Sequence, residues 1–105
     1  MARFDLYPNP NPRASHRLYL DVQSDLVLTS TRWCLPLLPL LPANAAMPLL
    51  SGAQLTVVLD GQSWVLDAPN FLAVPTALLR QARGRLLVDD QLRVEAALDF
   101  MLRGC

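Results

Sequence analysis

The segment DDQLRVEAALDFMLRGC, residues 89–105, carries the only long helical pattern in this chain of 105 residues. At about 100° per residue, an apolar arc faces a stripe of polar residues, so we expect a helix with one face in the core. Asp89 is expected to cap its start, and Gly104 to end it in a left-handed conformation. The expected core arc holds Val94, Ala96, Ala97, Leu98, Phe100 and Met101, and the polar stripe holds Gln91, Glu95, Asp99 and Arg103.

Before this helix, the sequence has the period-two patterns of strands. In RLYLDVQ, residues 17–23, apolar and polar residues alternate strictly, which predicts a strand with one buried face. In LTVVLDGQSWVLD, residues 55–67, Asp60 and Gly61 separate two apolar runs and favour a two-residue type I′ turn. Shorter strands are expected at residues 3–6, 32–38 and 70–74. Pro36 is expected to end the second of these strands.

Length and composition restrict the class of protein. A chain of 105 residues fits one domain with one modest core, and strands followed by a helix predict a single α+β domain over residues 1–105. Nine Arg balance nine acidic residues and Lys is absent, which argues against direct binding of nucleic acid or of an anionic membrane. Because 52% of the residues are hydrophobic, apolar surface should remain after the core forms. We therefore expect a protein partner and a homodimer.

The first residues, MARFDLYP, show no apolar segment or cleavage site of a secretory signal, so a cytoplasmic location is expected. The longest apolar stretch, residues 35–50, is interrupted by prolines and is too short for a membrane span. After the strand that Pro36 ends, the proline-rich stretch up to Ser51 is expected to be irregular or extended. Cys34 and Cys105 are expected to be free thiols, because two cysteines so placed do not form a disulfide framework.

Patterns of catalytic or metal-binding residues are weak. His16 is the only histidine, and together with Cys34 and Cys105 it lacks the close spacing of a structural metal site, so no metal or other cofactor is expected. The four glycines are dispersed, which excludes a phosphate-binding loop. Acid–base cleavage of RNA stays open, with Arg17, Arg32 and His16 as candidates, although a net charge of zero disfavours RNA binding.

Five motifs follow one another along the chain: LDVQSD at residues 20–25, the tripeptide at residues 35–37, the hairpin with Trp64, AVP at residues 73–75, and the final ALDFMLRGC. In this order they resemble the CcdB family of toxins from type II toxin–antitoxin modules, over nearly the whole chain. The resemblance implies a compact antiparallel sheet of the SH3-like barrel type shared with MazF ribonuclease toxins, a smaller sheet, a C-terminal helix and a homodimer.

The resemblance also implies a function without catalysis by the toxin itself. Members of the family bind the A subunit of DNA gyrase, trap the enzyme on cut DNA, and support plasmid maintenance, and a CcdA-like antitoxin neutralises them. Their gyrase-binding surface combines the end of the last helix with an apolar pair after the LDVQSD strand. In this chain the matching positions are Leu26, Val27, Asp99, Leu102, Arg103, Gly104 and Cys105.

Two features of these positions stay open in the sequence. The run Leu26, Val27 and Leu28 is either packed on the core, which is the commoner arrangement, or an exposed contact patch. The family ends in Phe-Trp-Gly and an aliphatic residue, whereas here Arg103 replaces the Trp. A Trp anchor contributes on the order of 2–4 kcal/mol, so Arg103 either weakens gyrase poisoning by roughly 30- to 1,000-fold or meets an acidic patch on a divergent gyrase. The first outcome leaves a homologue that only binds the antitoxin.

Overall fold

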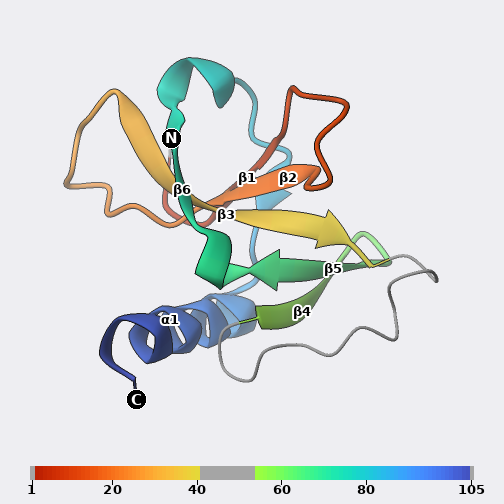
Figure 1. Ribbon diagram of the computed structural model, residues 1–105, viewed down its shortest axis with the longest axis vertical. Coiled ribbons are helices and arrows are strands. Elements are labelled where there is room, and N and C mark those ends of the chain that lie inside the picture. The colour runs from red at the N-terminus through yellow and green to blue at the C-terminus, as the bar shows by residue number, and fades with distance from the viewer. Residues whose placement is uncertain (1, 41–53, 105) are drawn as a thin grey trace.

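The structure, a computed structural model, describes residues 2–40 and 54–104 (Figure 1). Residues 41–53 and Cys105 are not described, so the expectations for this thiol and for the proline-rich stretch from residue 41 to Ser51 lie outside the described residues. The elements in chain order are β1 (Asp5–Pro8), β2 (Leu18–Asp21), β3 (Thr31–Pro39), β4 (Gln54–Leu59), β5 (Gln62–Asp67), the 3-10 helix η1 (Ala68–Asn70), β6 (Leu72–Pro75), the 3-10 helix η2 (Thr76–Leu78), β7 (Gly84–Arg85) and α1 (Val88–Arg103).

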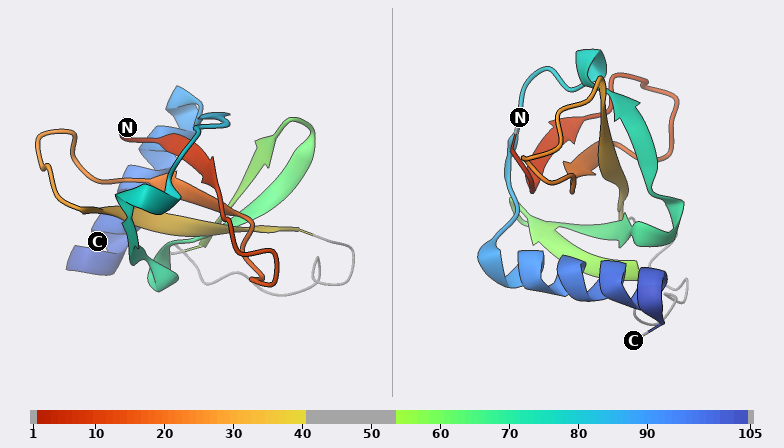
Figure 2. Two further views of the ribbon diagram at one scale, coloured as in Figure 1. Left: turned by 90° about the horizontal axis from the view of Figure 1, so that it is seen from above. Right: turned by 90° about the vertical axis from the view of Figure 1, so that its left-hand side faces the viewer.

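The strands that the described residues form make one antiparallel sheet in the order β4-β5-β3-β2-β1-β7, and β6 pairs with β3 as well. The long strand β3 pairs with β6 near its start and with β5 near its end, and the sheet curls around the core (Figure 2). Helix α1 lies alongside β4 and η1 (Figure 1). The α+β fold is confirmed, and the smaller sheet that the resemblance implies is joined to the main one through β3.

Pro36 does not end β3, contrary to the expectation from sequence. The carbonyls of Trp33 and Leu37 accept 2.9 Å hydrogen bonds from the residues that flank β2. Because backbone groups alternate in direction along a strand, the nitrogen of Pro36 faces the other edge of β3. On that edge, pairing with β6 stops at Cys34 and pairing with β5 begins at Leu37. The missing N–H therefore lies in the gap between two partner strands, where no carbonyl requires it.

The sheet carries a buried cluster on each face, so the expectation of one buried face for residues 17–23 is wrong. Leu20 packs in the larger cluster with the helix residue Val94, while Tyr19 belongs to a second cluster. Asp21 and Gln23 are also buried. The second cluster consists of Tyr7, Tyr19, Cys34, Val74 and Leu79, with Leu72 packed against it.

The Asp60-Gly61 hairpin is confirmed. Leu59 pairs with Gln62 across the turn, and the φ angles of Asp60 and Gly61 are 51° and 78°, so both central residues have the positive φ of a type I′ turn.

The final helix is confirmed, and its details differ at two places. Gly104 ends it with a φ of 74°, as predicted, but Leu87 occupies the cap position at its start and Asp89 lies within the first turn. The buried face is narrower than expected, since Ala96 and Phe100 are exposed. The curled sheet covers only the side of the helix that holds Val94, Ala97, Leu98 and Met101.

Candidate partner-docking site

The loop between β2 and β3 carries the first part of the predicted docking surface. The exposed fractions of Leu26, Val27 and Leu28 are 93%, 49% and 87%. Packing on the core, the commoner arrangement, is therefore wrong for this run, and the run is exposed, as the alternative of a contact patch requires. Burying an apolar side chain of this size is worth about 1.5–3 kcal/mol, so a partner that covers the loop gains that energy.

The end of α1 carries the second part. Leu102 is 72% exposed. Nη2 of Arg103 lies 3.2 Å from Oδ1 of Asp99, which is four residues earlier on the helix. The backbone N–H of Gly104 donates to the carbonyl of Phe100 at 2.8 Å, which closes the helix. These side chains are thus presented on a regular, capped helix end.

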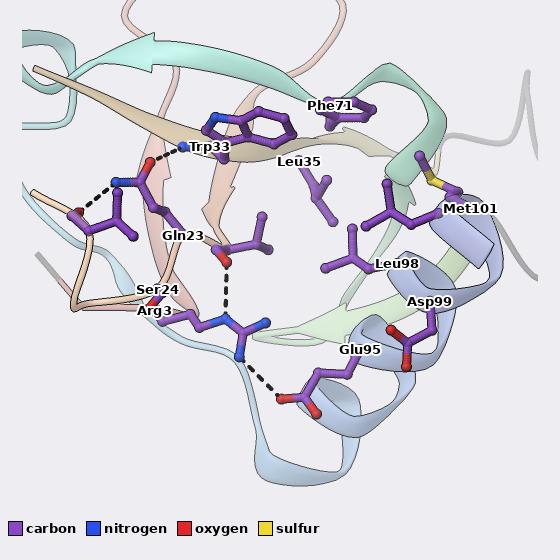
Figure 3. Close-up of a pocket in the computed structure, with 13 residues that line it drawn as sticks. Arg3, Gln23, Ser24, Trp33, Leu35, Phe71, Glu95, Leu98, Asp99 and Met101 are labelled. Atoms are coloured by element: carbon purple, nitrogen blue, oxygen red, sulfur yellow. Dashed lines mark hydrogen bonds and ion pairs between the residues drawn. The ribbon is translucent and has the colours of Figure 1, made fainter. Parts of the chain in front are cut away.

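A pocket of about 540 Å³ lies between the two parts (Figure 3). Val27, Asp99 and Leu102 line it, so the fold brings these three predicted residues to one site, whereas Leu26, Arg103 and Gly104 are not in its lining. The apolar floor and sides come from the sheet and the helix, and include Val22, Leu35, Leu98 and Met101. The site therefore combines an apolar hollow with a rim that includes charged side chains, as protein-binding sites do.

Two aromatic residues form a wall of this pocket that the sequence did not reveal. The rings of Trp33 and Phe71 stack with their centroids 5.0 Å apart and their planes at 17°. Their exposed fractions are 51% and 38%, so both offer ring surface to a partner. Trp33 has the strand parity of the buried Leu35, but it lies farther toward the loop. In the sequence, Trp33 is recognisable only by its spacing of two from Leu35, and this spacing predicts a buried side chain.

Gln23 connects the exposed loop to β3. Its Nε2 donates to the carbonyl of Val27 at 2.7 Å and to Oγ1 of Thr29 at 3.3 Å, while its Oε1 accepts the backbone N–H of Trp33 at 3.0 Å. Figure 3 shows the amide between the loop and the strand. Gln23 itself is only 7% exposed, whereas its two partners in the loop are exposed.

A buried ion pair lies next to the backbone of Gln23 and holds it in place. Nε of Arg32 donates to Oδ2 of Asp21 at 2.8 Å, and its Nη2 donates at 3.2 Å both to the carbonyl of Gln23 and to Oδ1 of Asp25. The same oxygen of Asp25 accepts the backbone N–H of Arg3 at 2.9 Å. The bond from Arg3, together with Arg32, holds the pKa of Asp25 below its usual value.

Arg3 joins the loop side of the pocket to the helix side. Its Nε donates to the carbonyl of Val22 at 3.0 Å, and its Nη1 lies 3.4 Å from Oε1 of Glu95 on α1 (Figure 3). The guanidinium carbon also lies 4.7 Å from the ring centroid of Phe4. Such cation–π contacts contribute about 0.5–1 kcal/mol at exposed sites.

The residues considered for RNA cleavage have other contacts. Arg32 is 4% exposed and committed to Asp21 and Asp25, and Nε2 of His16 lies 3.3 Å from the hydroxyl of Tyr19. In the two described ranges, no group of three or more metal-ligating side chains is found. None of the helices in those ranges is both long and apolar enough to cross a membrane.

Comparison with known families gives one result. A family model described as CcdB protein matches residues 3–104. No curated protein sequence gives a significant match to the chain.

Proposed function

The chain belongs to the CcdB family of toxins, and we propose that it poisons DNA gyrase by binding the A subunit through the loop and helix end described above. The proposal assigns this contact to Leu26, Val27, Asp99, Leu102, Arg103, Gly104 and Cys105. It needs no catalytic residue and no cofactor, because the trapped gyrase supplies the chemistry of DNA cleavage.

The observation that carries this proposal is the exposure of Leu26 and Leu102 on two elements that border one pocket. Their exposed fractions are 93% and 72%. Large apolar side chains held outward by a folded loop and a capped helix are typical of interface anchors. The aromatic wall of Trp33 and Phe71 adds ring surface of the kind enriched at interfaces.

The proposal includes three partners and a location. A second copy of the chain forms a homodimer, which doubles the helix end, and a CcdA-like antitoxin covers the toxin and removes it from gyrase. The gyrase A subunit is the target, and DNA is engaged only through gyrase, in keeping with the zero net charge. The toxin acts in the cytoplasm, where gyrase acts, and the pair supports plasmid maintenance.

The test is to add the purified protein to gyrase from the same host. We expect supercoiling to be inhibited or cleaved DNA to accumulate, and the product of the neighbouring small gene to reverse the effect. Absence of both effects would overturn the proposal. The same preparation is incubated with an RNA transcript without metal, because degradation that disappears on substitution of Arg17 would favour the RNA-cleaving alternative.

Arg103 favours a second candidate function, a homologue that binds antitoxin without poisoning gyrase. The family has Trp at this position, and here a guanidinium paired with Asp99 replaces it. If this candidate is correct, the natural chain is harmless when expressed alone and Arg103→Trp creates toxicity. If the natural chain is already toxic, this candidate is excluded.

A further inference from the structure

We propose that Gln23 is a positioning residue for the docking loop: its buried amide holds the segment from Ser24 to Ser30 so that Leu26 and Val27 point outward. The inference deepens the proposed function and rests on it for the identity of the partner. The geometric part, that Gln23 orders the loop, can be tested on the protein alone.

The loop cannot be held by apolar packing. Every residue from Ser24 to Ser30 is exposed, and Leu26 at 93% makes almost no packing contact. Its internal bonds are short-range: the N–H of Val27 donates to the carbonyl of Ser24 at 3.1 Å, and the N–H of Leu26 donates to Oγ of Ser24 at 3.2 Å. These bonds shape a turn without fixing where the turn lies on the molecule.

Asp25 is held near the start of the loop by Arg3 and Arg32, and the carbonyl of Ser30 at its end accepts the N–H of Thr76 at 2.9 Å. The amide of Gln23 fixes the stretch between these two points. Both hydrogens of Nε2 are used within the loop, on Val27 and Thr29, and Oε1 binds the backbone of Trp33 in β3. No other residue type of the same length offers two donors and an acceptor in one plane. A Glu would turn a carboxylate toward the carbonyl of Val27, and an Asn would be one methylene too short to reach it.

Gln23 is itself fixed by the buried ion pair. Its N–H donates to Oδ1 of Asp21 at 3.0 Å, and its carbonyl accepts Nη2 of Arg32 at 3.2 Å. Because Asp21 and Arg32 are 0% and 4% exposed, they form a rigid base for the amide. Contacts therefore run without a break from the core through Gln23 to Val27.

This arrangement gives the LDVQSD motif a physical role. Its polar residues Asp21, Gln23 and Asp25 occupy alternate positions, and all three contact Arg32. Asp21 ends β2 and the other two follow it; Asp21 and Asp25 bind Arg32 through their carboxylates and Gln23 through its backbone carbonyl. The motif thus supplies the residues that hold the loop in place, and the apolar pair that follows it, Leu26 and Val27, is held outward by them.

The first experiment measures loop order by amide hydrogen exchange in the purified protein. The N–H of Val27 reports on the loop, because it donates to the carbonyl of Ser24 only while the turn is formed. For Gln23→Ala and Gln23→Glu, which no longer bind the carbonyl of Val27, we expect exchange of this amide to accelerate at least tenfold. Gln91→Ala is the matched control, because Nε2 of Gln91 also donates to a backbone carbonyl, that of Leu86, at 2.8 Å and outside the pocket. The control should leave the Val27 amide unchanged.

A second variant covers the case in which loss of Gln23 prevents folding. Thr29→Val removes one acceptor of the amide, together with the bond that the Thr29 hydroxyl donates to the carbonyl of Thr31, at an exposed position, so the core is untouched. We expect a smaller acceleration of exchange at Val27 with no change in the thermal midpoint. Unchanged exchange at Val27 in Thr29→Val and in every folded Gln23 variant would overturn the positioning role.

The second experiment measures affinity for the gyrase A subunit of the same host. A freed loop must be ordered again on binding, so we expect Gln23→Ala to bind about 10- to 100-fold more weakly, and Gln91→Ala to bind as the natural protein does. Equal affinity of Gln23→Ala and Gln91→Ala would overturn the link between loop order and docking. Absence of binding by the natural protein would overturn the proposed function, and hydrogen exchange would then decide the positioning role by itself.

Discussion

The guanidinium of Arg32 and the carboxylate of Asp21 form a buried ion pair, with Nε 2.8 Å from Oδ2 and side chains 5% and 0% exposed. Because both charged groups are buried, each depends on the other and on the hydrogen bonds around the pair. Gln23, which contacts the docking loop, is hydrogen-bonded to both members of this pair. The ion pair that stabilises the core therefore also helps to position the candidate site.

Removal of one partner of this pair should be costly. We expect Arg32→Met to lower the free energy of unfolding by about 3–5 kcal/mol, because it leaves Asp21 as a buried charge without its counter-ion. Urea denaturation at pH 7 measures this change. Arg85→Met is the control, because the pair of Arg85 with Asp5 has side chains 52% and 20% exposed and should be worth less than about 1 kcal/mol. Equal losses in the two variants would contradict the prediction.

The contribution of Asp25 to stability should depend on pH. Its pKa in the folded protein is below the ordinary value of 3.8, first because of the hydrogen bond from the N–H of Arg3 and then because of Arg32. A lowered folded pKa stabilises the fold above the ordinary value, and this stabilisation is lost as the pH falls through the lower folded pKa. The advantage of the natural protein over Asp25→Asn in urea should therefore shrink between pH 6 and pH 3. An advantage that is constant over this range would argue against an ionised Asp25 as the hydrogen-bond acceptor.

The parts of the fold that short-range chemistry determines could be predicted from the sequence. The turn at Asp60-Gly61 depends on two residues that tolerate positive φ, and Gly104 ends the helix for the same reason. The predictions that were wrong concern features that depend on segments distant in the sequence. Pro36 lies inside a strand because β5 and β6 leave a gap beside it, and Tyr19 is buried because Val74 and Leu79 reach the second face of the sheet.

The candidate site was predicted only in part, for a similar reason. The resemblance selected Val27, Asp99 and Leu102, and the fold brings these three residues around one pocket. Neither Trp33 nor Phe71 was selected, because stacking between β3 and the residue that precedes β6 depends on how the sheet curls. The supporting role of Gln23 was also hidden, since alternation alone placed it on an exposed face.

Cys34 should be unreactive in the folded protein. The thiol is fully buried, and burial raises its pKa to about 12. Only the thiolate reacts rapidly with alkylating reagents, so at pH 8 the folded protein should resist iodoacetamide at this position. A Cys105→Ser background isolates the signal of Cys34, and mass spectrometry counts the labels. We expect no label in buffer within the time that labels the protein fully in urea, and equally rapid labelling in both would contradict the buried position.

Docking through exposed leucines predicts a loss of binding without a loss of stability. Leu26→Glu and Leu102→Glu should each weaken binding to the gyrase A subunit by roughly 30-fold or more, the effect of losing an anchor worth about 2 kcal/mol. Because these side chains are 93% and 72% exposed, the free energy of unfolding should change by less than about 0.5 kcal/mol. Val58→Glu on β4, at a side chain 57% exposed and outside the pocket lining, is the control and should bind normally.

The two leucines also separate two modes of docking, because Leu102 lines the pocket whereas Leu26 is not in its lining. A partner that inserts a side chain into the pocket needs Leu102 and the wall formed by Trp33 and Phe71, so Leu102→Glu and Phe71→Ala should weaken binding together. A partner that only covers the loop should respond to Leu26→Glu and tolerate Phe71→Ala. Normal binding by both leucine variants would mean that the docking surface lies elsewhere, whatever the family of the chain.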